Sequence, residues 1–485
     1  MYLRRQNKLF MKMDNFKMEE TDINNSEYSC GDFTKGSIPR LIIKLSLPMI
    51  IAQLVNVLYS ICDRIFIGHL SSNPELALSG LGVSFPLISL ILGFTNLFGS
   101  GGLTIFSIAR GEGDNKKASA ILQHSFYMLL TCSLITTFIS LLFSNQILVF
   151  SGASQESLIY ANTYLTVYIL GTPFAMLATG LNTYISAQGF AKHGVMSIII
   201  GAISNIILDP IFIYVLDMDV SGAALASVIS QFLSASYVMV FLINKNIPVP
   251  LKIRQFNFNA SIAKNIIALG TPGFIFQATN SLVQTVFNSN LYILGGDIHV
   301  ATISLLNSIR SLLISTINGL TSACHPIMSY NYGASQYKRV RKVIRTHFVF
   351  CLVISGFFWL ILMCFPSLFL NLFTKDPNFI NIGSKALRIY FSMFFMMTFQ
   401  IVGQTAFQGI GYASHAIFFS LLRKVFLVIP ATYIIPAITN LGVWGIYLAD
   451  PISQLSRAVI TFITMYFVIW KKLNQENAHR LKKVK

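Results

Sequence analysis

Residues 244–261 read NKNIPVPLKIRQFNFNAS, and this polar stretch decides how the chain is organised. It has the composition of a linker, since its prolines and basic side chains interrupt an apolar helix. Six long apolar stretches precede it and six follow it, each able to cross a bilayer as a helix. The predicted helices are 41–68, 78–109, 118–150, 158–187, 193–216, 221–243, 262–295, 299–332, 343–373, 380–410, 414–438 and 442–470.

The composition is that of a membrane protein. Of the 485 residues, 54% are hydrophobic and only 11% are charged, whereas soluble domains carry roughly 25% charged residues. Soluble, disordered and fibrous chains are therefore excluded. We predict an all-α polytopic membrane protein whose twelve transmembrane helices form two pseudo-symmetric six-helix lobes.

The net charge of +17 suggests an anionic partner such as nucleic acid when it is taken as a total. The positions of the charges give a different explanation. With both termini cytosolic, 26 of the 35 Lys and Arg residues fall on inner segments and one, Lys375, falls on an outer loop. This bias follows the positive-inside rule. We expect a multi-pass protein of the cytoplasmic membrane with both termini in the cytosol and no nucleic-acid partner.

The polar segments also divide the chain into parts. Its six cysteines stand singly, so no disulfide framework or cysteine metal site is expected. The predicted division is a cytosolic polar tail at 1–40, an N-lobe at 41–243, a cytosolic linker at 244–261, a C-lobe at 262–470 and a basic cytosolic tail at 471–485.

The two lobes repeat each other in sequence. Pro48 and Gln53 are echoed by Pro272 and Gln277 at an offset of 224 residues. Further pairs are Gln188 with Gln408 and Pro210 with Pro430 at 220, and Gly222 with Gly445 and Gln231 with Gln454 at 223. Because each predicted lobe has an even number of helices, both lobes enter the membrane in the same sense. Such a parallel repeat builds a central cavity between two lobes.

Three of the 18 acidic residues, Asp63, Asp209 and Asp450, fall inside apolar stretches. A carboxylate within a membrane is unfavourable and marks a functional site by default. Asp63 and Asp209 fall at similar depth in the outer part of the N-lobe. Asp450 takes the place of Ser227 in the repeat and is assigned either to the substrate cavity or to a structural role.

Oxygen-bearing neighbours support an ion site in the N-lobe. Tyr59 precedes Asp63 by four residues, and Asn205 precedes Asp209 by four, so each pair shares a helix face. Ser227 reaches the same layer. Such groups suit a proton or a hard cation, with Na⁺ ligands at Asp63, Asn205 and Asp209. The alternative is a hydrogen-bonded network without an ion, in which Asp63 pairs with its neighbour Arg64.

Enzyme chemistry is not expected. The sequence carries no phosphate-binding loop, no metal-ligand spacing and no nucleophile set on a recognisable scaffold. No cofactor is predicted beyond a coupling ion, H⁺ or Na⁺, whose gradient supplies the energy.

Other polar and adaptable residues fall within the spans. Arg310, Arg423 and Lys424 either extend to the membrane surface or line an aqueous cavity. Met393 and Met397 either form an adaptable apolar wall or face lipid. The predicted substrate cavity comprises Gln53, Gln277, Asn280, Arg310, Met393, Met397 and Asp450.

The chain resembles the multidrug and toxic compound extrusion (MATE) family, and in particular a bacterial branch of it, over about residues 36 to 470. The residues that carry this resemblance are Leu47-Pro48, CDRIFIG at 62–68, Ala187-Gln188-Gly189, NIILDP at 205–210, PIMSYNYGA at 326–334, GVWG at 442–445 and Ala449-Asp450-Pro451.

The resemblance implies a cation-coupled exporter with a central cleft between two lobes. It implies an N-lobe ion site at Asp63, Asn205, Asp209 and Tyr59, with Asn182 from the fourth helix and a hydroxyl at Ser227. Some branches carry a glutamate near Gln277 in a C-lobe cation site, and the neutral Gln277 puts coupling through that site in doubt.

We therefore predict a monomeric antiporter that exports amphipathic, mostly cationic compounds by alternating access while H⁺ or Na⁺ returns. A flippase for lipid-linked saccharide precursors is the alternative, since it would share the two-lobed architecture. It would need a cavity rich in Arg and Lys, for which Arg310, Arg423 and Lys424 are the candidates.

Overall fold

The structure is a computed structural model that describes residues 32–68, 74–151, 155–371 and 377–476. Most of the predicted N-terminal tail, the end of the C-terminal tail and Lys375 lie outside the described residues. Within the described ranges the chain is helical. This agrees with the sequence, because a helix satisfies its own backbone hydrogen bonds where lipid offers no partner.

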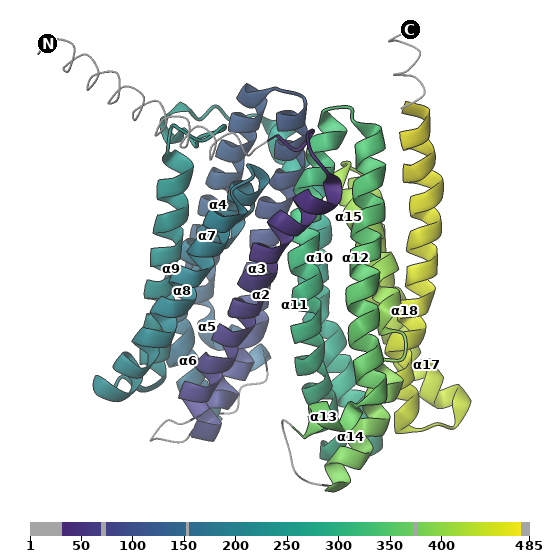
Figure 1. The fold of residues 1–485 in the computed structure, drawn as a ribbon. Coiled ribbons are helices and arrows are strands. Elements are labelled where there is room, and N and C mark those ends of the chain that lie inside the picture. Colours follow the sequence, from purple (N-terminus) through teal and green to yellow (C-terminus); the bar gives the residue numbers. More distant parts are fainter. Residues whose placement is uncertain (1–31, 69–73, 152–154, 372–376, 477–485) are drawn as a thin grey trace, which may run out of the picture.

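Helices of the first half of the chain gather on one side of the molecule, drawn in violet to teal in Figure 1. We call them the N-terminal half. They are α2 (Ile38–Gly68), α3 (Pro74–Gly111), α4 (Asn115–Leu142), α5 (Ser144–Phe150), α6 (Gln155–Leu170), α7 (Thr172–Ala187), α8 (Ala191–Pro210), the π-helical turn η2 (Ile211–Val215) and α9 (Asp219–Ile243).

Helices of the second half, drawn in green to yellow, gather on the other side (Figure 1). We call those from α10 onward the C-terminal half; the short η3 (Ile253–Gln255) precedes them. They are α10 (Ala260–Gly295), α11 (Asp297–Gly333), α12 (Tyr337–Cys364), α13 (Pro366–Leu370), α14 (Pro377–Tyr390), η4 (Phe394–Met396), α15 (Met397–Gly409), α16 (Ala413–Leu421), η5 (Leu422–Val428), α17 (Ile429–Thr439), α18 (Val443–Met465) and η6 (Tyr466–Trp470).

The described helices include 11 spans that are long and apolar enough to cross a membrane, and a bent pair supplies a twelfth. The bent pair is α6 and α7, which meet at 55°. Each of the twelve predicted stretches overlaps one of these spans, so the predicted fold class is confirmed. The bend falls at Gly171, where a Cβ atom would lie 2.7 Å from side chains of Val228 and Gln231 on α9.

The two halves pack tightly where α2 and α10 begin and where α3 and α11 end. We call this end of the molecule the terminal face. A Cβ atom on Gly270 of α10 would lie 1.7 Å from the carbonyl oxygen of Leu97 on α3. One on Gly333 of α11 would lie 2.0 Å from the carbonyl oxygen of Ile108, also on α3. Only glycine permits backbones to approach this closely.

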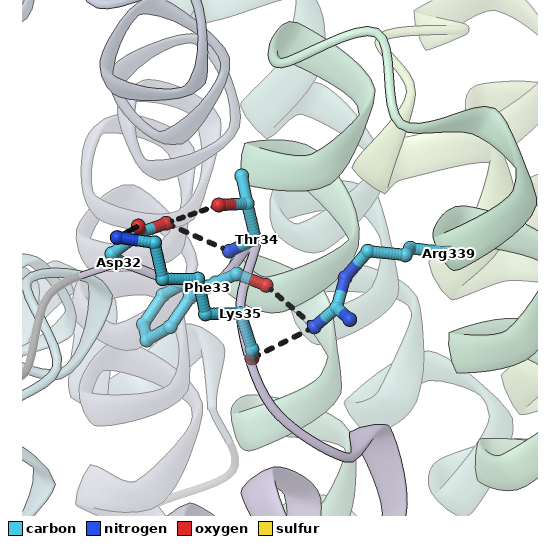
Figure 2. A network of polar contacts seen from close by, with 5 residues as sticks. All are labelled: Asp32, Phe33, Thr34, Lys35 and Arg339. Atoms are coloured by element: carbon cyan, nitrogen blue, oxygen red, sulfur yellow. Dashed lines mark hydrogen bonds and ion pairs between the residues drawn. The ribbon is translucent and has the colours of Figure 1, made fainter.

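Residues 32–37, which we call the strap, lead into α2 of the N-terminal half but are bound to helices of the other half. Figure 2 shows Arg339 of α12 reaching the strap backbone. Its guanidinium donates to the carbonyl oxygens of Phe33, Lys35 and Gly36 at 2.9–3.0 Å. Asn331 of α11 also donates to Phe33, at 3.0 Å. The strap therefore ties the two halves together at the terminal face.

Side chains of the strap strengthen this contact. The Phe33 side chain is fully buried and packs edge-to-face on Tyr330 with ring centroids 5.3 Å apart. Asp32 accepts hydrogen bonds from the backbone and hydroxyl of Thr34 (Figure 2). Burial by itself raises the pKa of Asp32, but the hydrogen bonds from Thr34 and the nearby Lys35 ammonium outweigh burial and lower this pKa below its usual value.

We expect Arg339→Ala to release the strap. The substitution removes the three charge-assisted hydrogen bonds to the strap, and loss of even about 1.4 kcal/mol would raise the population of the open strap about tenfold. Trypsin should then cut after Lys35 about tenfold faster. The cut is measured by mass spectrometry of timed digests. Arg345→Ala, at an exposed position of the same helix, is the matched control, and equal rates in the two variants would contradict the role of Arg339.

Candidate functional site

Two carboxylates lie buried in the N-terminal half, near the helix ends that point away from the terminal face. Asp63 of α2 is 8% exposed, and Asp209 of α8 is fully buried. The two interact electrostatically with each other and with the hydroxyl group of Tyr59. Keeping two carboxylates ionised at this depth costs free energy, so helix packing alone does not explain their position.

Hydrogen bonds join this cluster across three helices. Asn205 donates through Nδ2 to Oδ1 of Asp209 at 3.2 Å and to Oγ of Ser227 at 3.4 Å. The hydroxyl groups of Tyr59 and Ser227 lie 3.1 Å apart. The structure thus brings together five of the predicted ion-site residues, from α2, α8 and α9, and we call these five the ion cluster. An ion bound here would contact three helices at once.

The cluster contains acceptor atoms that lack donors. Among the described residues, Oδ2 of Asp209 and Oδ1 of Asn205 are buried without a hydrogen-bond partner. Buried acceptors of this kind are unfavourable unless a donor or a cation reaches them. A proton on Asp209 or a Na⁺ ion held by oxygen atoms would satisfy this demand. The alternative explanation was an ion pair between Asp63 and Arg64. The side chain of Arg64 is not among those that the structure describes.

Sequence reasoning missed two tyrosines and a glutamine beside the cluster. Tyr164 and Tyr168 of α6 stack with ring centroids 5.6 Å apart, and both interact electrostatically with Asp63. Gln231 of α9 lies beside Tyr168. The available signal was the spacing of four between the tyrosines, which places both on one face of a helix.

Asn182 does not join the ion cluster. It donates through Nδ2 to the carbonyl oxygen of Gly194 at 3.0 Å and lines a different cavity, of about 290 Å³. That cavity takes residues from both halves, including Gln53 of α2 and His325 of α11. We call it the inter-half cavity. Gln53 was predicted for the substrate cavity and Asn182 for the ion site, but both line the inter-half cavity.

A cluster of polar side chains also lies in the C-terminal half. Arg310 of α11 and Asp450 of α18 form an ion pair with Nη1 and Oδ2 2.9 Å apart. The same Nη1 donates to the hydroxyl of Tyr390 at 2.7 Å, and this hydroxyl donates to Asn307 at 2.9 Å. These four residues line a cavity of about 310 Å³, which we call the C-half cavity; Asn280 lines it as well.

The other predicted substrate residues lie elsewhere. Gln277 lies against α3 near Gly93, which places it at the contact between the halves. Met397 is 2% exposed and belongs to the hydrophobic core of the C-terminal half. Met393 is half-buried just before η4. The side chains of Arg423 and Lys424 lie outside the described ones.

No group of three or more His, Cys, Asp or Glu residues suited to a metal ion occurs within the described part of the chain. Membrane-spanning helices around a buried acidic cluster and two polar cavities define an integral membrane transporter. The ion cluster and the two cavities hold polar and ionisable side chains that can bind an ion or a ligand.

The chain belongs to the MatE family and is a MATE transporter, not an enzyme. The family model matches residues 48–211 and 272–434. The two matched segments start 224 residues apart, which is the offset found in the sequence repeat.

Curated relatives are similar over most of their length. Multidrug export protein MepA of Staphylococcus aureus is 26% identical over 439 residues, which covers 89% of this chain and 95% of that protein. MepA of Staphylococcus haemolyticus is 26% identical over 438 residues, which covers 90% of this chain and 94% of that protein.

Solved structures support the same fold. A multidrug resistance MATE family transporter in an outward-facing conformation superposes with a TM-score of 0.86, at 24% identity, over 92% of this chain and 99% of that chain. A transporter from Pyrococcus furiosus superposes with a TM-score of 0.86, at 23% identity, over 92% of this chain and 98% of that chain.

Proposed function

We propose that this protein is a multidrug exporter that moves amphipathic, mostly cationic compounds out of the cell in exchange for H⁺ or Na⁺. The observation that carries the proposal is the ion cluster, in which a buried Asp209 has one oxygen atom without a donor. The substrate class comes from the curated relatives, which are named multidrug export proteins. The protein acts as a monomer.

Ion binding would couple to transport through the packing of three helices. A proton or Na⁺ at Asp63 and Asp209 neutralises buried charge and changes how α2 packs against α8 and α9. A ligand shifts a conformational equilibrium only by its differential affinity for the two states. A change of charge at a buried site supplies such a difference, because the cost of burial differs between a closed and a hydrated state.

The membrane orientation is part of the proposal. The terminal face is cytosolic, so both termini lie in the cytosol and the ion cluster lies nearer the outer surface. The basic residues on α12 near the terminal face support this orientation through the positive-inside rule. Ions would then enter the cluster from outside, and export would proceed against their inward flow.

The export proposal is tested with inside-out membrane vesicles. We expect the vesicles to accumulate ethidium when an imposed H⁺ or Na⁺ gradient runs from the lumen to the outside. The comparison of the two gradients identifies the coupling ion. Accumulation under ATP alone, with both gradients collapsed by ionophores, would overturn the proposal.

The flippase alternative is less well supported. It needs a strongly positive cavity for a pyrophosphate group. Arg310 shares its charge with Asp450 at 2.9 Å, which leaves the C-half cavity without net charge from this pair. A rise in melting temperature with a lipid-linked saccharide, and none with ethidium, would reverse this order.

A further inference from the structure

The C-half cavity occupies the position that the repeat assigns to the ion cluster. Four of its lining or neighbouring residues correspond to residues at or beside that cluster. The pairs are Asp63 with Phe287 at an offset of 224, Asp209 with Ile429 at 220, Ser227 with Asp450 at 223 and Tyr168 with Tyr390 at 222. Phe287, Tyr390 and Asp450 line the cavity, and Ile429 adjoins its lining residue Val428.

The same location therefore carries different chemistry in the two halves. Both carboxylates of the ion cluster are replaced by apolar side chains, Phe287 and Ile429. The carboxylate that lines the C-half cavity is that of Asp450 on α18, and Arg310 neutralises its charge. A cation that enters this cavity would meet a carboxylate already engaged by a guanidinium group, so the cavity is poorly suited to the coupling ion.

The guanidinium group of Arg310 has bonding capacity left. Its side chain is 10% exposed. Nη1 serves both Tyr390 and Asp450, whereas Nη2 is buried with no hydrogen-bond partner among the described residues. A buried guanidinium nitrogen without an acceptor is costly. An acceptor brought by a ligand would remove that cost.

The rest of the cavity suits a ligand that carries polar groups. Amide and hydroxyl side chains line it, from Asn280, Gln284, Ser311, Ser315 and Asn318. Ser311 and Asn318 are exposed on α11, so the cavity has a polar entrance. Phe276 and Ile314 add apolar surface for the body of an amphipathic compound.

We propose that the C-half cavity binds the carboxylate of zwitterionic amphipathic compounds through Nη2 of Arg310. This proposal rests on the export function and assigns to it a residue that binds carboxylates. A carboxylate forms strong, charge-assisted bonds with a guanidinium group. A zwitterion brings no net charge into a cavity whose own pair is neutral, so its burial is less costly than that of an anion. Asp450 holds the guanidinium group in place and partly neutralises its positive charge.

The test compares rhodamine B, a zwitterion with a free carboxylate, with its methyl ester, a cation. Binding of each dye to the purified protein is measured by fluorescence anisotropy, and the ratio of the two dissociation constants is the readout. The double variant Arg310→Gln/Asp450→Asn removes both charges with side chains of similar size. We expect the ratio to shift against rhodamine B by about tenfold, because one charge-assisted hydrogen bond is lost.

The single variant Asp450→Asn gives a prediction of opposite sign. It leaves Arg310 with its positive charge uncompensated, so the ratio should shift in favour of rhodamine B. If the double variant does not fold, Arg310→Lys replaces it, since an ammonium keeps the charge but lacks the second guanidinium nitrogen. An unchanged ratio in Asp450→Asn and in the variant of Arg310 overturns the proposal, as does the absence of rhodamine B binding to the wild-type protein.

The outcome is separable from that of the export proposal. Anisotropy in detergent needs no gradient, so the dye ratio can respond to Arg310 even if ion gradients drive no efflux. In that case the export proposal fails and the carboxylate site stands. If gradients drive ethidium movement while the dye ratio is indifferent to Arg310 and Asp450, export stands and the carboxylate site is refuted.

Discussion

Asp209→Asn and Asp63→Asn are each expected to abolish ion-driven efflux. Asparagine has the shape of a protonated aspartate but neither gains nor loses charge, so the substituted position no longer binds and releases a coupled charge. One charge that crosses a potential of 100 mV supplies about 2.3 kcal/mol. Loss of one coupled charge should therefore lower the attainable concentration ratio of the exported dye about fiftyfold. The measurement is ethidium accumulation in inside-out vesicles.

Stability separates this loss of coupling from misfolding. Replacing a buried, incompletely satisfied carboxylate by a neutral amide removes the cost of burying charge. Asp209→Asn should therefore melt no lower than the wild-type protein. Asp217→Asn is the matched control, because Asp217 is an exposed acid that follows η2 in the same half. Gradient-driven efflux that persists in both cluster variants would contradict the proposed ion site.

The fold followed from the sequence because the membrane imposes a simple rule. A stretch that is apolar for about 20 residues has to form a helix in lipid. The twelve predicted stretches met this condition, including 158–187, where the structure has two helices at 55° to each other. The bend itself was not predicted, since it depends on Gly171 meeting Gln231 of α9 and not on the hydropathy of the stretch.

The ion cluster was predictable in part, for a local reason. Asn205 and Asp209 are four residues apart, so their hydrogen bond follows from helix geometry alone. Ser227 and Tyr59 joined them through the depth of their helices and the family resemblance. Gln231 gave no distinct signal, because a glutamine in an apolar stretch does not reveal which face of its helix meets another.

The ion pair of the C-terminal half shows the limit of reading each helix by itself. Arg310 and Asp450 were both predicted to line the substrate cavity, but their ion pair was not predicted, and they are 140 positions apart. Their pairing depends on which faces of α11 and α18 meet, and a hydropathy pattern does not determine that. Asn182 shows the same limit, since its helix contributes to the inter-half cavity and not to the ion cluster.

Gly270→Ala is expected to disrupt the observed arrangement of the two halves. The added Cβ would lie 1.7 Å from the carbonyl oxygen of Leu97 and 2.7 Å from its Cα atom. These are backbone atoms of α3 and cannot rotate away, so the helices must separate. Gly101 of α3 is equally constrained, because its Cβ would lie 2.2 Å from the carbonyl oxygen of Ile266. The two glycines form one helix crossing near the terminal face.

The expected effect of Gly270→Ala is large and opposite in sign to the usual effect of alanine. In a helix interior, alanine is more favourable than glycine by about 1 kcal/mol. Overpacking against backbone atoms should instead destabilise the closed terminal face by roughly 3 kcal/mol, which shifts the balance between two conformations on the order of a hundredfold. Efflux should fall sharply, because alternating access requires this face to close. Ethidium accumulation in inside-out vesicles and the melting temperature measure the two effects.

Gly82→Ala and Gly356→Ala are matched controls for the Gly270→Ala experiment. Both glycines lie inside helices, α3 and α12, and a Cβ atom at either position would meet nothing within 4 Å. These variants gain helix propensity without a steric penalty, so they should melt at or above the wild-type temperature and retain efflux. If Gly270→Ala behaves as they do, the close crossing of α3 and α10 does not hold the terminal face closed. If Gly270→Ala and Gly101→Ala alone lose efflux, the crossing is the contact on which closure of this face depends.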